Sequence, residues 1–180
     1  MRIQAAESIL LLIDLQERLL PAIAHHDTVL ANARWLLAVA RVLGIPVRVT
    51  EHCAARIGAS APELRTELND GEIVAKRYFS AVPEGGLLAG LDEGARQWVV
   101  SGTEAHVCVQ QTVLDLLAAG HQVFVVEEAV GSRRERDKAL ALERMRQNGA
   151  EIVSREMVAF EWLAHADAPA FSKVLKEYIR

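Results

Sequence analysis

The amino-acid sequence predicts an α/β protein whose parallel β-sheet is covered by helices on both faces. Short, apolar, β-branched runs alternate along the chain with longer segments whose apolar residues recur at helical spacing, and this alternation is typical of parallel strands joined by right-handed crossovers. Residues 9–13 are all apolar, as expected of a strand that is buried on both faces. No linker or break in composition divides the chain, so residues 1–180 are expected to form a single domain.

Six strands are expected, and each is bounded by turn or cap residues. They are residues 8–13, 45–50, 72–75, 97–101, 122–127 and 151–154. Helical spacing predicts helices at residues 15–25, 28–43, 62–68, 85–94, 109–119, 133–148, 156–164 and 170–178. Pro21 weakens the first of these helices, and several glycines weaken the one at residues 85–94. Residues 51–60 are expected to form a loop.

Composition limits the class of protein and its partners. The chain is 51% hydrophobic and carries 20 Lys and Arg against 24 Asp and Glu, which gives a net charge of −4 at pH 7. Both signs are spread along the chain, so neither a basic nucleic-acid-binding surface nor a polybasic membrane patch is expected. The apolar runs are too short to span a membrane, and residues 1–7 lack the pattern of a signal peptide. With two cysteines and no Cys-x-x-Cys pair, we expect a cytoplasmic protein with reduced thiols.

The stretch from Gly102 to Thr112 is the strongest candidate for a functional site. Cys108 lies here between a predicted strand, residues 97–101, and a predicted helix, residues 109–119. Backbone N–H groups and the dipole at a helix start stabilise a thiolate, and the same N–H groups can bind the oxyanion formed when a thiolate attacks a carbonyl. The sequence therefore predicts Cys108 as a nucleophile whose pKa lies well below the free-thiol value of about 8.5. The alternative is that Cys108 is a small buried hydrophobic residue, as most free cysteines are.

Two charged residues follow other predicted strands. Asp14 follows residues 8–13, and Lys76 follows residues 72–75. Because the carboxyl ends of parallel strands line one edge of the sheet, where ligands bind, we expect Asp14, Lys76 and Cys108 to converge. Asp14 can then accept the thiol proton and return it to the leaving group, and a protonated Lys76 can stabilise both anions. The alternatives are that Asp14 is a helix cap and that Lys76 is solvated.

Several motifs resemble those of the isochorismatase-like cysteine hydrolase superfamily, and more closely its isochorismatase-domain-containing subgroup. The matching segments occur in the same order over roughly residues 8–165, and they are residues 11–16, 50–51, 58–64, 76–80, 102–109 and 144–150, with Thr112, Asp115 and Gly120. The resemblance implies a six-stranded parallel sheet in a Rossmann-like, three-layer α/β/α arrangement. It also implies a catalytic triad of Asp14, Lys76 and Cys108, and a homo-oligomer, since members of the superfamily commonly assemble.

The resemblance further implies the details of the turn before the cysteine. A non-proline cis peptide is expected at Thr103–Glu104, with the backbone N–H groups of Glu104 and Cys108 as oxyanion-hole donors. Thr103 is also a candidate for the substrate pocket. Glu51 and Phe79 are two more candidates, because they lie on predicted loops at the same edge of the sheet, although core packing is an equally good interpretation of Phe79.

No metal or other cofactor is expected. Nicotinamidase-type members of the superfamily carry an Asp-x-His metal site after the second strand, whereas this sequence reads Thr50-Glu51-His52-Cys53-Ala54 there. One histidine beside one glutamate falls short of the three protein ligands of a catalytic zinc site. His52 is therefore expected to be solvated, and Cys53 to be packed or partly exposed.

These inferences predict a cysteine hydrolase that cleaves a small amide or a related C–N bond. Its partner is then a small-molecule substrate, and neither nucleic acid nor a membrane. Vinyl ether hydrolysis of the isochorismatase type is an alternative reaction, but the resemblance implies that members with that activity can lack the cysteine. Two other functions also stay open: a non-catalytic interaction protein that keeps the fold and its pocket, and a redox sensor in which Cys53 pairs with an oxidised Cys108.

Overall fold

The centre of the protein is a sheet of six parallel strands. The structure is a computed structural model that describes residues 1–91, 94 and 96–179. The strands lie in the order β3-β2-β1-β4-β5-β6, which confirms the predicted sheet. Their bounds are β1 (Ser8–Ile13), β2 (Val47–His52), β3 (Ile73–Lys76), β4 (Gln97–Thr103), β5 (Gln122–Gly131) and β6 (Glu151–Val153).

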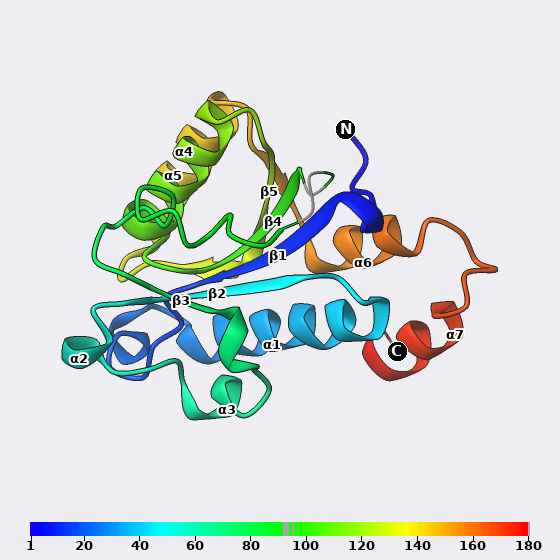
Figure 1. The fold of residues 1–180 in the computed structure, drawn as a ribbon, viewed down its shortest axis with the longest axis horizontal. Helices are drawn as coiled ribbons and strands as arrows, with labels where there is room; N and C mark the ends of the chain where they lie inside the picture. Colours follow the sequence, from blue (N-terminus) through cyan, green and yellow to red (C-terminus); the bar gives the residue numbers. More distant parts are fainter. Residues whose placement is uncertain (92–93, 95, 180) are drawn as a thin grey trace.

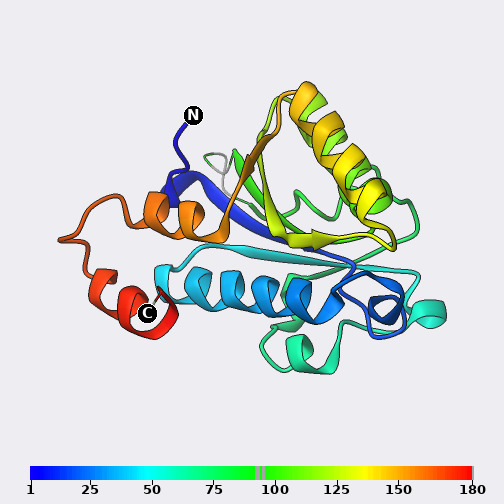
Figure 2. The same cartoon turned by 180° about the vertical axis from the view of Figure 1, so that it is seen from behind.

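Helices cover both faces of this sheet (Figures 1 and 2). One face packs against α1 (His26–Leu43), α3 (Pro62–Arg65), α6 (Arg155–Leu163) and α7 (Phe171–Val174), and the other against α4 (Gln110–Ala118) and α5 (Glu135–Gln147). Side chains of β1 alternate between these two cores, with Leu10 and Leu12 in the first and Ile9, Leu11 and Ile13 in the second. The strand is apolar without alternation because both of its faces are buried.

The order of the strands reverses between β1 and β4. From β1 the chain adds β2 and β3 on one side, and then crosses to β4 on the other. In open sheets of this kind, ligands bind outside the carboxyl ends of the strands at such a reversal. Gly102 lets the two ends approach, because it has a φ of +145° and a Cβ built there would lie 2.3 Å from the carbonyl oxygen of Ile13.

Two predicted helices are wrong in the described part of the chain. Residues 15–25 form turns and a short 3-10 helix, Leu20–Ala22, because Pro21 interrupts the helix and Gln16 forms an isolated antiparallel bridge with Ser60 instead. Residues 85–90 form turns and bends, as their glycines favour, and residues 92 and 93 of that predicted helix lie outside the described residues. The predicted loop at residues 51–60 contains the end of β2 and a short helix, α2 (Ala54–Ile57).

The helix that follows β4 begins earlier than the sequence predicts. A π-helical turn, Ala105–Val109, precedes α4 and carries Cys108. Such turns occur frequently at functional sites. No helix in the part of the chain that the structure describes is long and apolar enough to cross a membrane.

Candidate active site

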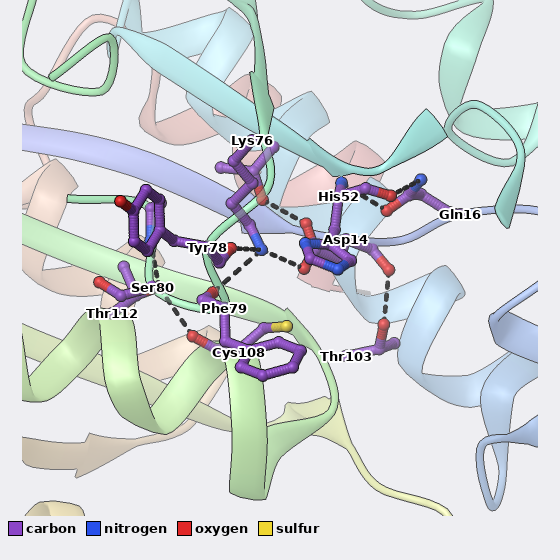
Figure 3. Close-up of polar contacts among 12 residues, drawn as sticks. Asp14, Gln16, His52, Lys76, Tyr78, Phe79, Ser80, Thr103, Cys108 and Thr112 are labelled. Atoms are coloured by element: carbon purple, nitrogen blue, oxygen red, sulfur yellow. Dashed lines mark hydrogen bonds and ion pairs between the residues drawn. The ribbon is translucent and has the colours of Figure 1, made fainter. Parts of the chain in front are cut away.

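Asp14 and Lys76 form a buried ion pair at the carboxyl edge of the sheet. Asp14 directly follows β1, and Lys76 is the last residue of β3. The Lys76 Nζ lies 2.7 Å from the Asp14 Oδ2, and both side chains are 0% exposed. Because β2 lies between these strands, Lys76 has to extend across β2 to reach Asp14 (Figure 3). The Thr50 hydroxyl donates to Asp14 Oδ1 at 2.7 Å, so each carboxylate oxygen has a donor.

The same lysine also fixes the segment that follows it. Its ammonium group donates to the carbonyl oxygens of Phe79 at 2.9 Å and Tyr78 at 3.3 Å, in addition to Asp14. An ammonium group has three N–H donors, and these three acceptors use all of them. Lys76 thus fixes the connection after β3 over the site.

Cys108 lies in the π-helical turn between β4 and α4, and it is 5% exposed. The Thr112 hydroxyl donates to the carbonyl oxygen of Cys108 at 2.7 Å and accepts the N–H of Ala81 at 3.0 Å. These two bonds join the cysteine turn to the connection that Lys76 holds. Figure 3 shows the side chains of Asp14, Lys76 and Cys108 directed toward one another, the first two from the ends of β1 and β3 and the third from the π-helical turn after β4.

The predicted low pKa of Cys108 is wrong. Burial raises the pKa of this thiol from 9.0 to about 12, and the Asp14 carboxylate contributes further in the same direction. Lys76 opposes this shift, but its charge is already paired with Asp14. A neutral thiol therefore sits beside a neutral pair of charges, so the resting group is the thiol and not the thiolate.

The turn before the cysteine is made without a cis peptide. All the described peptide bonds are trans, so the expected cis bond at Thr103–Glu104 is wrong. Glu104 instead has a φ of +44°, and this left-handed residue reverses the chain between β4 and the π-helical turn. Asp14 after β1 and Cys53 after β2 also have positive φ values, of +50° and +43°. Such unfavourable conformations cluster at functional sites.

Residues 8–157 match the family described as Isochorismatase domain. The chain belongs to the isochorismatase family. Isochorismatase domain-containing protein 1 of Danio rerio is 38% identical over 94% of this chain and 60% of that protein, and isochorismatase domain-containing protein 2A of Mus musculus is 37% identical over 97% of this chain and 84% of that protein. The chain thus spans less than two thirds of the Danio protein.

Among solved structures, the MAR1 ribonuclease of Caenorhabditis elegans is similar, with a TM-score of 0.92 and 33% identity over 100% of this chain and 93% of that one. This membership suggests a hydrolase.

The three pocket candidates of this isochorismatase-family protein have different positions. Phe79 is 51% exposed, and its carbonyl oxygen accepts from Lys76 at 2.9 Å. Thr103 is 0% exposed and its hydroxyl donates to the carbonyl oxygen of Asp14 at 2.5 Å, so its side chain fixes the backbone of Asp14. Glu51 accepts the N–H and the hydroxyl of Ser60 at 2.7 and 2.8 Å.

Glu51 lies at the same edge of the sheet, but on the other face of β2 from the Thr50 side chain. Successive side chains of a strand point to opposite faces, so Glu51 of β2 lies on the face opposite to Thr50, which contacts Asp14. Glu51 lines, together with Cys53 and Lys76, a cavity of about 610 Å³. A polar residue at the end of a strand can point to either face of the sheet, because its direction depends on the register of the strand.

His52 belongs to the site although the sequence predicts it to be solvated. The Gln16 side chain accepts the His52 N–H at 2.8 Å and donates to the His52 carbonyl oxygen at 3.0 Å. The imidazole stacks on the Phe79 ring, with centroids 5.5 Å apart and planes at 28°. Its Nδ1 is buried without a hydrogen-bond partner among the described residues. In the sequence, the sign of the contact between Gln16 and His52 is a polar amide two residues after Asp14.

Within residues 1–91, 94 and 96–179, no group of three or more His, Cys, Asp or Glu side chains is arranged to hold a metal ion. Near Asp14, Lys76 and Cys108, the imidazole of His52 faces the phenyl ring of Phe79 and not a second metal-binding side chain. The groups that converge here are a carboxylate, an ammonium group and a thiol, which together suit proton transfer and nucleophilic attack.

Proposed function

We propose that this protein is a cysteine-dependent hydrolase that cleaves a small amide, or a related C–N bond, through a thioester. Cys108 is the nucleophile, Asp14 the general base and acid, and Lys76 the group that holds Asp14 in place as an anion. One observation carries the proposal. A protonated thiol, with its pKa raised to about 12, lies at the reversal of the strand order next to a carboxylate that is fixed by Lys76 and Thr50.

The acylation step follows from the protonated state of the thiol. The Cys108 sulfur attacks the substrate carbonyl carbon while its proton moves to Asp14, because a thiol with a high pKa needs a base within reach. The backbone N–H groups of Glu104 and Cys108 are the proposed donors to the resulting oxyanion. The C–N bond then breaks, Asp14 returns the proton to the nitrogen, and an amine or ammonia leaves a thioester on Cys108.

Deacylation uses Asp14 and Cys108 again, with water as the nucleophile and the sulfur as the leaving group. Asp14 takes a proton from a water molecule, the hydroxide oxygen attacks the thioester carbonyl, and the carbon–sulfur bond breaks. The carboxylic acid is released, and the proton on Asp14 returns to the sulfur. The charges of Asp14 and Lys76 are the same at the start and the end of each cycle, and no cofactor is consumed.

Phe79 and His52 are the proposed walls of the substrate pocket. The exposed ring of Phe79 offers an apolar surface at this edge of the sheet, and the imidazole of His52 on which it stacks brings a polar group beside that surface. Aromatic surface with a small number of polar groups is typical of a pocket for a small molecule. Thr103 and Glu51 are better explained by their bonds to Asp14 and Ser60.

The first test is acylation of the protein by p-nitrophenyl acetate, read by intact mass and peptide mapping, followed by ammonia release from a panel of primary amides. We expect an acetyl group on Cys108 of the wild type, and no turnover by Cys108→Ser. Cys53→Ser is the matched control, since it removes the other cysteine of the chain, and it should behave as the wild type. Acylation that persists in Cys108→Ser but disappears in Cys53→Ser would show that the nucleophile is assigned incorrectly.

Ribonuclease activity, which the name of the C. elegans protein raises, is less well supported here. Phosphodiester cleavage needs cations that face the phosphate, whereas the Lys76 side chain is 0% exposed and donates to three acceptors of the protein itself. Incubation with single-stranded RNA is the direct check. RNA cleavage that is lost in Cys108→Ser or Asp14→Asn would replace the amide substrate by RNA.

We further propose a cytoplasmic homo-oligomer that acts on a small molecule. The free thiols of Cys53 and Cys108 are consistent with a reducing compartment. Met157 and Phe160 on α6, and Leu140 on α5 at the opposite face of the sheet, are exposed apolar side chains of the kind that a subunit interface covers. Light scattering of the purified protein gives the number of subunits directly, and a monomer at all concentrations would reject this part of the proposal.

A further inference from the structure

We propose that the Glu104 carboxylate, clamped by Arg133, is a positioning group that sets the turn before Cys108 for oxyanion binding. This inference rests on the proposed function, because it assigns a role to a side chain next to the proposed oxyanion donors. It concerns a carboxylate that the chemistry above does not use. The Glu104 side chain is 7% exposed, and a buried charged group requires an explanation.

The contacts of this carboxylate are unequal. Its Oε1 accepts from the Arg133 Nε at 2.6 Å. Its Oε2 is buried and has no hydrogen-bond partner among the described side chains. The His106 Nδ1 lies 3.5 Å from Oε2 and 3.0 Å from the Ser132 Oγ. The carboxylate is therefore held firmly through one oxygen only.

Arg133 and Ser132 connect this carboxylate to the neighbouring strand. Both directly follow β5, whose last residue, Gly131, is paired with Thr103 at the end of β4. The clamp therefore joins the chain after β5 to the first residue after β4. It crosses the place where the chain leaves the sheet to form the cysteine turn.

The backbone of Glu104 anchors that turn. Its carbonyl oxygen accepts the N–H of Val107 at 2.8 Å and the N–H of Val109 at 3.3 Å, the residues on either side of Cys108. Glu104 itself has a φ of +44°, which costs free energy and persists only where the surroundings enforce it. A displaced Glu104 would move its own N–H together with the turn that carries Cys108.

Oxyanion binding is sensitive to such a displacement. The donors have to lie about 2.7–3.1 Å from the developing oxyanion, and loss of one donor typically lowers the rate about 100- to 1,000-fold. Alkylation of a thiol by a haloacetamide forms no oxyanion, because it is a displacement at a saturated carbon. The ratio of acylation to alkylation at Cys108 thus isolates the oxyanion site from the access and the ionisation of the thiol.

The experiment measures both rates at Cys108 in the full chain, with p-nitrophenyl acetate for acylation and iodoacetamide for alkylation. The variants are Glu104→Gln, which keeps the shape of the side chain and removes its charge, and Arg133→Ala, which keeps Glu104 and removes the clamp. Arg136→Ala is the control, because Arg136 is an exposed arginine of α5 that does not line the cavity formed around Glu104, His106 and Arg133. Circular dichroism shows whether each variant is folded. If Glu104→Gln does not fold, the comparison of Arg133→Ala with the wild type tests the proposal.

We expect acylation to fall about tenfold or more in Glu104→Gln and Arg133→Ala, with alkylation unchanged, because a displaced donor loses part of the about 100- to 1,000-fold that a complete loss removes. The double variant should be no worse than the single ones, because the two side chains act as one unit. Equal loss of both rates would overturn the inference, since it would indicate general damage to the site, and so would unchanged acylation. If wild-type Cys108 is alkylated but not acylated, the proposed function fails and this inference fails with it.

Discussion

Two ion pairs at the same edge of the sheet have similar distances and very different surroundings. Lys76 and Asp14 are 2.7 Å apart and both side chains are 0% exposed, whereas Arg133 and Glu104 are 2.6 Å apart with side chains that are 64% and 7% exposed. In the first pair, three acceptors satisfy the ammonium group and both carboxylate oxygens have donors. In the second, one carboxylate oxygen has no hydrogen-bond partner among the described residues.

This difference indicates that burial, and not distance, decides what each pair does. Two charges removed from water have to satisfy each other almost completely, and loss of either partner is costly. The Lys76–Asp14 pair is therefore a fixed part of the fold as well as of the proposed chemistry. An exposed arginine contributes little to folding, so the Arg133–Glu104 pair can orient a turn without supporting the whole domain.

The largest difference in stability between the two ion pairs is expected from Lys76→Met. The variant leaves the Asp14 carboxylate buried without its cation, so we expect the free energy of unfolding to fall by about 3–5 kcal/mol. Arg133→Ala, the matched change in the pair with an exposed cation, should lower it by less, about 1–3 kcal/mol, the cost of leaving the buried Glu104 oxygen without its donor. Urea denaturation of both variants measures the two values. Similar losses would mean that burial does not distinguish the pairs.

Asp14→Asn changes the acidic partner of the same pair. We expect acylation of Cys108 to fall by about 100- to 10,000-fold, the usual contribution of a general base. The pKa of the thiol should fall at the same time, because burial and the Asp14 carboxylate both raise it, Lys76 lowers it, and the variant removes the contribution of the carboxylate. The pH profile of iodoacetamide alkylation should therefore move to lower pH. An unmoved profile would show that Asp14 does not act on the thiol.

Much of the site could be predicted from the sequence because a parallel sheet imposes a simple rule. The carboxyl ends of its strands share one edge, so Asp14 after β1, Lys76 at the end of β3 and Cys108 after β4 were expected to lie together. The order of the strands could not be read from hydrophobic patterns. It places β2 between the acid and the base, and only the length of the lysine side chain closes that gap.

The sign of the thiol pKa shift could not be predicted, since it depends on burial. A helix start favours a thiolate, but at 5% exposure the loss of hydration outweighs this effect. His52 and Glu51 are neighbours in sequence with opposite outcomes for the same reason. The register of β2 turns one toward Phe79 and the other toward Ser60, and a shift of one residue would exchange them.

A smaller effect is expected from Thr50→Val, which removes one donor and leaves the ion pair in place. Asp14 Oδ1 would then be buried without the Thr50 hydroxyl, and an unsatisfied buried group of this kind costs about 1–3 kcal/mol. Thr66→Val is the control, because the Thr66 hydroxyl also makes one hydrogen bond, but at an exposed position, where about ±0.5 kcal/mol is usual. If thermal denaturation gives equal losses for the two variants, the buried carboxylate is not the cause.

The smallest effect on folding should come from Phe79→Ala, which separates the two roles of this residue. The carbonyl oxygen of Phe79 accepts from Lys76, and this bond survives the change because it belongs to the backbone. Only the half-exposed ring and its stacking on His52 are lost, which is worth about 0.5–1.5 kcal/mol. If the ring binds substrate, acylation by p-nitrophenyl benzoate should fall more than acylation by p-nitrophenyl acetate. Leu140→Ala, which removes an exposed apolar side chain on α5, should change neither rate. Equal loss with both esters would place Phe79 among the supports of the Lys76–Asp14 pair and outside the pocket.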